Sequence, residues 1–324
     1  MMSELHKFIF DGLPVRGQLI RLTGSWREVL RRRSEAGNAL PTAVQELLGE
    51  LTVAAALMQS NIRFNGALIL QIFGDGPVKL AVAEVQTDLA FRSTAKVVGE
   101  VLEEMPFETL VNRGGEGRCA ITLDPADKSQ GRQPYQGVVS LRDSRDAPLQ
   151  SLSDALQHYM RQSEQLETRL VLAADKEVAA GLLIQRLPVE GGANLGARDE
   201  QARSDDDEAF NRIAHLTRSL SRTELLALDG PTILRRLYWE EPLRCFDPLL
   251  QGLAPRFECR CSRARVARML QGLGRVEIDD IVAEQGRVEI GCDFCGLQYR
   301  FDVVDVGELF TPLHDQMPPS AAIN

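Results

Sequence analysis

The sequence predicts an α+β fold: an N-terminal α+β domain, a helical linker and a small C-terminal zinc-binding domain with a β-hairpin knuckle. Three observations lead to this prediction. Short alternating or apolar runs are mixed with helical patterns from residue 7 to residue 188. An acidic stretch and a set of helical signals follow, and four of the six cysteines lie within 37 residues near the C-terminus.

Length and composition favour an ordinary globular protein of about two domains, with 324 residues, 44% apolar and 26% charged. The longest nearly unbroken apolar run, Leu51 to Met58, is far shorter than the roughly 20 residues that span a bilayer. The first seven residues lack the basic and apolar regions of a secretory signal. We therefore expect a cytoplasmic protein without membrane partners, and the net charge of −9 disfavours nonspecific nucleic-acid binding.

The N-terminal domain is expected to contain several strands separated by turn-forming residues. The predicted strands are Lys7–Phe10, Val15–Leu22, Ala67–Phe73, Val78–Val85, Cys119–Leu123 and Gly137–Leu141. Apolar residues at helical spacing predict a core helix over Pro41–Ser60, and Ser151 is the expected side-chain cap of a second helix. Arg169–Ala174 and Gly181–Leu187 are expected to form a hairpin that closes the domain before Pro188.

The linker is expected to begin with an exposed stretch from 190 to 208, where two arginines face seven acidic residues. Short helices should follow, because Ser221 and Glu224 fit a capping box and residues 229–231 break the pattern. These helices have little apolar surface to share, so we expect them to need a neighbouring domain. The expected domains are 1–188 (α+β), 189–250 (acidic stretch and helical linker), 251–313 (four-cysteine zinc domain) and 314–324 (flexible tail).

The cysteine pattern is Cys259-Arg260-Cys261, thirty residues, then Cys292-Asp293-Phe294-Cys295-Gly296. Four thiolates complete a tetrahedral zinc site, so we expect one zinc per chain in the reduced form. Residues 288–290 and 297–301 alternate like the two strands of a hairpin. The zinc either holds a small domain together or keeps reactive thiolates for oxidant sensing, since a Cys-x-Cys disulfide is strained and easily reduced.

Charged residues near the cysteines leave two further readings open. Residues 256–268 hold five arginines against one glutamate, which would favour thiolates or cover a solvated helix face. Residues 255–313 hold eight arginines against ten acidic residues, a balance that makes a zinc-ribbon nucleic-acid module the weaker alternative. A thiol–disulfide oxidoreductase is another alternative, although a strand rather than a helix is expected after Cys295.

Other motifs for catalysis are missing from the sequence. It has no phosphate-binding loop or dinucleotide fingerprint, and its four histidines form no metal-binding pair. We therefore expect neither an enzyme nor an ATP-driven chaperone. Cys119 and Cys245 lie outside the cysteine pattern, and the sequence gives them no role.

The chain resembles the redox-regulated 33 kDa heat-shock chaperone family. The resemblance is most specific at residues 257–262, 292–295 and 299–301. Supporting segments are Gly12–Gly17, Pro134–Gly137, Tyr159 with Ser163-Glu164-Gln165, and Gly181–Gln185 with Pro188.

The resemblance implies a chaperone that binds unfolding client proteins without ATP after oxidation, preventing their aggregation under oxidative stress. It implies zinc on Cys259, Cys261, Cys292 and Cys295 in the poorly active reduced form. Hypochlorous acid, or peroxide with heat, is then expected to form the disulfides Cys259–Cys261 and Cys292–Cys295, expel zinc and unfold the switch and linker. A homodimer is a candidate assembly of the oxidised form.

Overall fold

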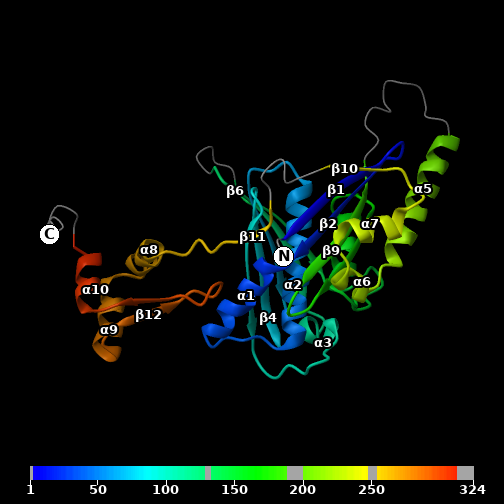
Figure 1. Cartoon of the computed structure of the whole chain (residues 1–324). Helices are drawn as coiled ribbons and strands as arrows, with labels where there is room; N and C mark the ends of the chain where they lie inside the picture. Colours follow the sequence, from blue (N-terminus) through cyan, green and yellow to red (C-terminus); the bar gives the residue numbers. More distant parts are fainter. Residues whose placement is uncertain (1–2, 128–132, 188–199, 247–253, 312–324) are drawn as a thin grey trace, which may run out of the picture.

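The computed structural model describes residues 3–127, 133–187, 200–246 and 254–311. Two β-sheets enclose one long helix (Figure 1). The first sheet contains, in spatial order, β10 (Leu243–Phe246), β1 (Glu4–Phe10), β2 (Val15–Leu22), β9 (Ala179–Arg186) and β8 (Thr168–Ala174). The second contains β11 (Arg256–Phe257), β5 (Ala90–Val97), β4 (Val78–Gln86), β3 (Gly66–Phe73), β6 (Arg118–Pro125) and β7 (Tyr135–Ser140). All neighbouring strands in both sheets are antiparallel except β11 and β5, which are parallel.

The helix between the sheets is α2 (Thr42–Asn61), which contacts strands of both. Every residue from Leu51 to Met58 is buried, as expected for a helix that is apolar on all sides. Gly49 lets this helix approach the β8–β9 hairpin, because a Cβ there would lie 2.4 Å from the Ala174 side chain. The predicted core helix is therefore confirmed.

Three further helices border the N-terminal sheets. They are α1 (Gly24–Glu35), α3 (Phe107–Val111) and α4 (Leu152–Gln162). The predicted cap of α4 is confirmed, since the Ser151 side chain accepts a hydrogen bond from the Asp154 N–H.

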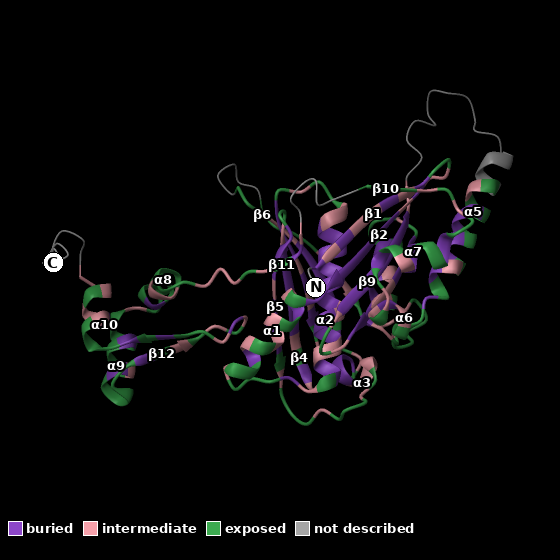
Figure 2. Ribbon diagram, in the orientation of Figure 1, coloured by how far each residue is buried: buried purple, intermediate pink, exposed green. Residues whose placement is uncertain are grey.

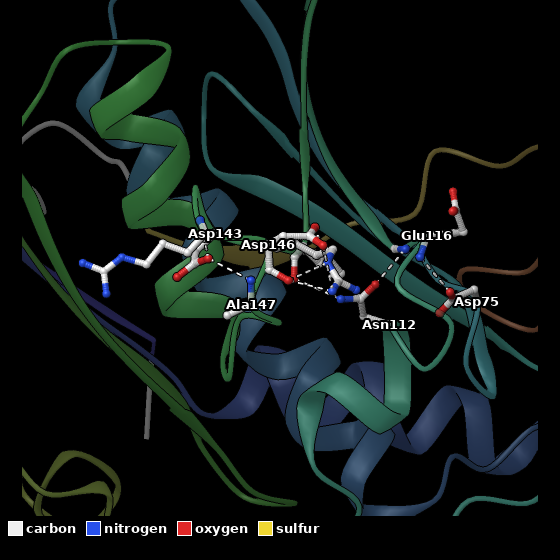
Figure 3. A network of polar contacts seen from close by, with 10 residues as sticks. Asp75, Asn112, Glu116, Asp143, Asp146 and Ala147 are labelled. Carbon is white, nitrogen blue, oxygen red and sulfur yellow. Dashed lines mark hydrogen bonds and ion pairs between the residues drawn. The ribbon is translucent and has the colours of Figure 1, made fainter.

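Polar side chains near α3 stabilise loops at the end of the second sheet. The Asp75 carboxylate accepts a hydrogen bond of 2.8 Å from the Glu116 N–H, and that of Asp143 accepts one of 2.9 Å from the Ala147 N–H. Figure 3 shows these side chains, together with Asn112, directed at the backbone of the loops. Such bonds lower the pKa of the Asp143 carboxyl, because they stabilise its ionised form.

The linker forms α5 (Glu200–Arg218), α6 (Arg222–Ala227) and α7 (Gly230–Tyr238). These helices pack on the outer face of the first sheet and form a second core with it. Its buried members include Phe8, Phe10, Val15, Leu19, Leu182 and Ile184 from the sheet, and Phe210, Ile213, Leu225, Ile233, Leu237 and Tyr238 from the helices. The linker helices thus bury their apolar faces on the N-terminal domain, and their expected dependence on it for folding stays a prediction.

Polar contacts also hold the linker on the sheet. The Arg21 guanidinium, only 5% exposed, donates to the carbonyls of Leu225 and Leu226. Arg222 pairs with Glu46 at 2.6 Å, and its guanidinium lies 4.0 Å from the Glu50 carboxylate. Both ends of α6 are therefore fastened to the N-terminal domain.

The C-terminal domain contains α8 (Arg263–Leu273), α9 (Arg275–Gln285), a hairpin of β12 (Val288–Gly291) and β13 (Gln298–Phe301), and α10 (Val303–Leu309). It extends away from the sheets, while the turn of its hairpin reaches toward α1 (Figure 1). Its core has seven buried apolar residues, and Figure 2 shows its helices mostly exposed. A core of this size supplies little folding free energy without further support.

The predicted strands all exist, with boundaries within a few residues, and so do the β8–β9 hairpin, the Ser221 capping box and the β12–β13 hairpin. The exposed stretch predicted over 190–208 is helical from residue 200 onward, where the 19-residue helix α5 begins, and Asp205, Asp207 and Glu208 are exposed as predicted. Its earlier part, 190–199, lies outside the described residues, as does the tail from 314. No helix in the described ranges is long and apolar enough to cross a membrane.

Candidate metal centre

The four cysteines of the predicted site converge on one point. The Sγ atoms of Cys259, Cys261, Cys292 and Cys295 all lie within 4.8 Å of one another, and they form a group able to hold a metal ion. The shortest separations join the two halves of the motif: 3.6 Å from Cys259 to Cys292 and 3.4 Å from Cys261 to Cys295. Tetrahedral zinc with Zn–S bonds of about 2.3 Å requires S···S distances of about 3.8 Å. The donor set therefore fits this metal.

The first cysteine pair is positioned by β11. This strand extends the second sheet beside β5, with the Arg256 N–H donating to the Leu89 carbonyl and the Glu258 N–H to the Phe91 carbonyl. Phe257 packs against the main core, so the chain leaves the N-terminal domain immediately before Cys259.

The second pair lies in the turn between β12 and β13. The Gly296 N–H donates to the Cys292 carbonyl at 2.7 Å, and the Cys292 N–H donates to the Leu297 carbonyl at 3.0 Å. Gly296 has φ +73°, a conformation that disfavours side chains with a Cβ. The glycine expected after the second cysteine thus turns the chain around the site.

Two residues beside the sulfurs were not found by sequence reasoning. The Tyr299 hydroxyl donates to the Cys261 Sγ at 3.0 Å, and this hydrogen bond raises the pKa of the tyrosine. Arg32 of α1 is close enough to Cys295 for their attraction to contribute to a raised Arg32 pKa, although its hydrogen bond to Glu28 is the larger cause. Both residues come from segments far from their cysteine in sequence, so spacing gives no signal for them.

The thiols differ in their readiness to ionise. A hydrogen bond shared with Cys259 lowers the pKa of Cys292 and raises that of Cys259. Burial raises the pKa of Cys295. A metal that binds all four must therefore displace protons from at least two reluctant thiols, which makes its affinity depend on pH.

Three of the five arginines of residues 256–268 form ion pairs with carboxylates outside this segment. Arg256 pairs with Asp88, Arg260 with Glu84, and Arg263 with Asp305. These three carboxylates, from the N-terminal and C-terminal domains, reduce the expected local charge from +4 to +1. These arginines fasten the domain rather than activate its thiols.

The metal-site turn itself contacts the N-terminal domain. Its Asp293 carbonyl accepts hydrogen bonds from the Arg33 guanidinium at 2.9 Å and from the Thr94 hydroxyl at 2.8 Å. The Arg92 guanidinium lies 4.2 Å from the centre of the Phe294 ring, within cation–π range. The two residues between Cys292 and Cys295 therefore connect the sulfur cluster to α1 and β5.

The remaining cysteines lie elsewhere. Cys119 is fully buried in β6, and burial raises its pKa to about 12. Cys245 is exposed on β10. Neither belongs to the sulfur cluster.

Comparisons with known proteins agree along almost the whole chain. A family model described as Hsp33 protein matches residues 3–302. The 33 kDa chaperonin of Chromobacterium violaceum is 42% identical over 309 residues, which cover 95% of this chain and 94% of that protein. The one from Methylobacillus flagellatus is 40% identical over 312 residues, with 95% and 94% covered.

The fold also matches a solved structure. The crystal structure of a 33 kDa chaperonin from Thermotoga maritima has a TM-score of 0.71 to this chain at 19% identity, covering 95% of this chain and 97% of that one.

Proposed function

The chain belongs to the Hsp33 family, and from this premise we propose that it is a redox-regulated, ATP-independent chaperone of the cytoplasm. It binds unfolding client proteins after oxidation of zinc-bound cysteines and prevents their aggregation; it is not an enzyme. The observation that carries this proposal is the convergence of four oxidisable sulfurs on a turn that contacts the N-terminal domain.

In the reduced protein, Cys259, Cys261, Cys292 and Cys295 would hold one zinc ion. When bound, the zinc supplies much of the folding free energy of the small C-terminal domain. The chain's own residues orient the ligands: Gly296 shapes the turn, and Tyr299 donates to Cys261.

Oxidation is expected to join Cys259 to Cys261 and Cys292 to Cys295. With hypochlorous acid, chlorine transfers to one sulfur of a pair and hydroxide leaves. The second thiolate attacks the chlorinated sulfur, chloride leaves, and a disulfide forms. Each pair thus loses two electrons, which reduce one hypochlorous acid to chloride and hydroxide. Disulfide sulfurs carry no negative charge, so the ligand set is lost.

Loss of the metal ligands affects the linker through two segments, the turn between Cys292 and Cys295 and the strand β11. Without an ordered turn, the Asp293 contacts with Arg33 and Thr94 are lost. The strand β11, which precedes the cysteines, then loosens from β5, and the linker helices separate from the first sheet. Separation uncovers apolar surface on both the helices and the sheet, which is the surface that a client needs. The domains 1–188, 189–250, 251–313 and 314–324 are the units of this proposal, and a homodimer of the oxidised form is compatible with it.

The test is light scattering of a heat-unfolded client with reduced, zinc-loaded protein or with protein treated with hypochlorous acid. We expect suppression of aggregation only after oxidation, without ATP. Equal suppression by both forms would overturn the redox regulation. Catalytic turnover in insulin reduction would instead support a thiol–disulfide oxidoreductase, and salt-dependent binding of RNA or DNA would support a nucleic-acid module.

A further inference from the structure

A small cavity lies at the C-terminal end of α2, far along the chain from the metal-site cysteines. Its volume is about 110 Å³, and its apolar walls come from α2, α4 and both sheets. The main apolar contributors are Met58, Leu68, Ile121, Leu123, Met160 and Leu183. An engineered apolar cavity of about 150 Å³ takes up benzene, so this one has room for a short aliphatic chain.

A wider groove of about 610 Å³ adjoins this cavity. The cavity and the groove share Arg16, Asn61 and Ile62 in their linings, so they adjoin each other at these three residues. Among the residues that the structure describes, the groove is lined by three cationic ones, Lys7, Arg16 and Arg63, and by no carboxylate. The apolar cavity therefore lies beside a positively charged groove.

In the described part of the chain, no carboxylate is paired with Arg16 or Lys7. Arg16 donates from Nη2 and Nε to the neutral Gln185 amide at 2.6 and 3.2 Å, and no ion pair of Arg16 occurs among the described residues. Lys7 donates to the Ser60 carbonyl at 2.6 Å, near the end of α2. A helix C-terminus supplies only about half a negative charge against these cations. Burial lowers the pKa of Arg16 and of Lys7, as expected for cations without a counter-ion.

The cavity has one acidic residue, at a position apart from the groove. The Tyr159 hydroxyl donates to the Glu164 carboxylate at 2.8 Å, and Glu164 lines the cavity but not the groove. This arrangement gives the site polarity: a negative group is favoured at Arg16 and disfavoured beside Glu164.

We propose that this site binds a small amphipathic monoanion, with its carboxylate in the groove at Arg16 and Lys7 and its short aliphatic chain in the cavity between the sheets. The charge complementarity of the groove and the apolar lining of the cavity each favour this class of ligand. The site is separate from the sulfur cluster, and the proposal does not depend on redox-regulated chaperone activity.

The experiment is isothermal titration of the reduced full-length protein with sodium octanoate, 1-octanol and octylammonium. We expect one octanoate site, with octanol roughly tenfold weaker because it lacks the charged hydrogen bonds to the guanidinium. Octylammonium should not bind measurably. Affinity should rise about fourfold for each methylene from butanoate until the cavity is filled.

Substitutions test where the carboxylate of the ligand binds, and NMR tests where its aliphatic chain binds. Arg16→Gln should weaken octanoate roughly tenfold, Arg16→Lys should restore much of the affinity, and the exposed α1 substitution Arg27→Gln should change nothing. Octanoate should shift the methyl resonances of Met58 and Leu183. Equal affinity for octanoate and octylammonium, or shifts confined to other residues, would overturn the proposal. If Arg16→Gln does not fold, the question is decided by Lys7→Gln and by two measurements on the wild type: the comparison of octanoate with octylammonium, and the NMR shifts.

Discussion

Replacing Ile233 by alanine tests the proposed role of the linker. Ile233 is 1% exposed and belongs to the core between α7 and the first sheet. Truncating a buried isoleucine costs about 2–5 kcal/mol. The lower value applies where neighbouring side chains move to fill the space, as they can between the linker helices. A cost of about 2 kcal/mol raises the population of molecules with a separated linker about 30-fold.

The expected results are lower protection and partial activity without oxidation. In reduced, zinc-loaded Ile233→Ala, amide exchange in α5–α7 should accelerate about 30-fold, while that of α2 stays slow. The same protein should suppress client aggregation in light scattering under reducing conditions. Trp239→Ala is the control, because it removes a large apolar side chain that is 74% exposed at the end of the same helix.

One outcome would refute this reasoning. If exchange in α5–α7 accelerates as expected but the reduced variant suppresses no aggregation, exposure of the linker is not what creates the client-binding surface. A client site elsewhere on the N-terminal domain would then have to be sought.

Three other predictions concern the metal and the docked state. Metal analysis should find one zinc per chain in wild type and Cys119→Ser but loss of zinc in Cys292→Ser; retention in the latter would contradict the ligand assignment. Burial raises the pKa of Glu50 to about 8, so the folded state binds its proton more tightly than the unfolded state. Its contribution to stability is therefore present below about pH 4.5 and lost as pH rises toward 8, by at most about 1.4 kcal/mol per unit. Urea unfolding of wild type and Glu50→Gln at several pH values should show this difference, and a constant difference would disprove it. Gly296→Ala places a Cβ 2.2 Å from that of Ala36 in a left-handed backbone position, so zinc release from this variant, followed with a colorimetric chelator, should be faster than from wild type.

The sequence predicts the parts of the fold that have a clear period or a local signature. Alternating apolar residues locate the sheets, and the unbroken apolar run locates α2 between them. Helix α1 was not predicted, because it contains four arginines and buries only Trp26, Val29 and Arg33. The strand β5 was also missed. The charge of residues 200–208 predicts an exposed stretch but gives no sign that it forms the start of helix α5.

The cysteine spacing identifies the sulfur cluster, but not what surrounds it. The contacts of Asp293 with Arg33 and Thr94 span 260 and 199 residues of sequence. Such contacts depend on how two domains pack, and no local pattern records them. The arginines near Cys259 show the reverse error: their charge is evident in the sequence, but the carboxylates that neutralise it, such as Asp88, are distant.

Hydrogen exchange before and after oxidation tests the central claim most directly. Full-length protein is compared in the reduced, zinc-loaded form and after treatment with hypochlorous acid, with zinc release measured in the same samples. We expect loss of protection across residues 205–313, together with the onset of aggregation suppression, while residues 1–188 remain largely protected. Unchanged protection in 205–313 after zinc release, in protein that nevertheless suppresses aggregation, would contradict the proposed unfolding of the switch and linker.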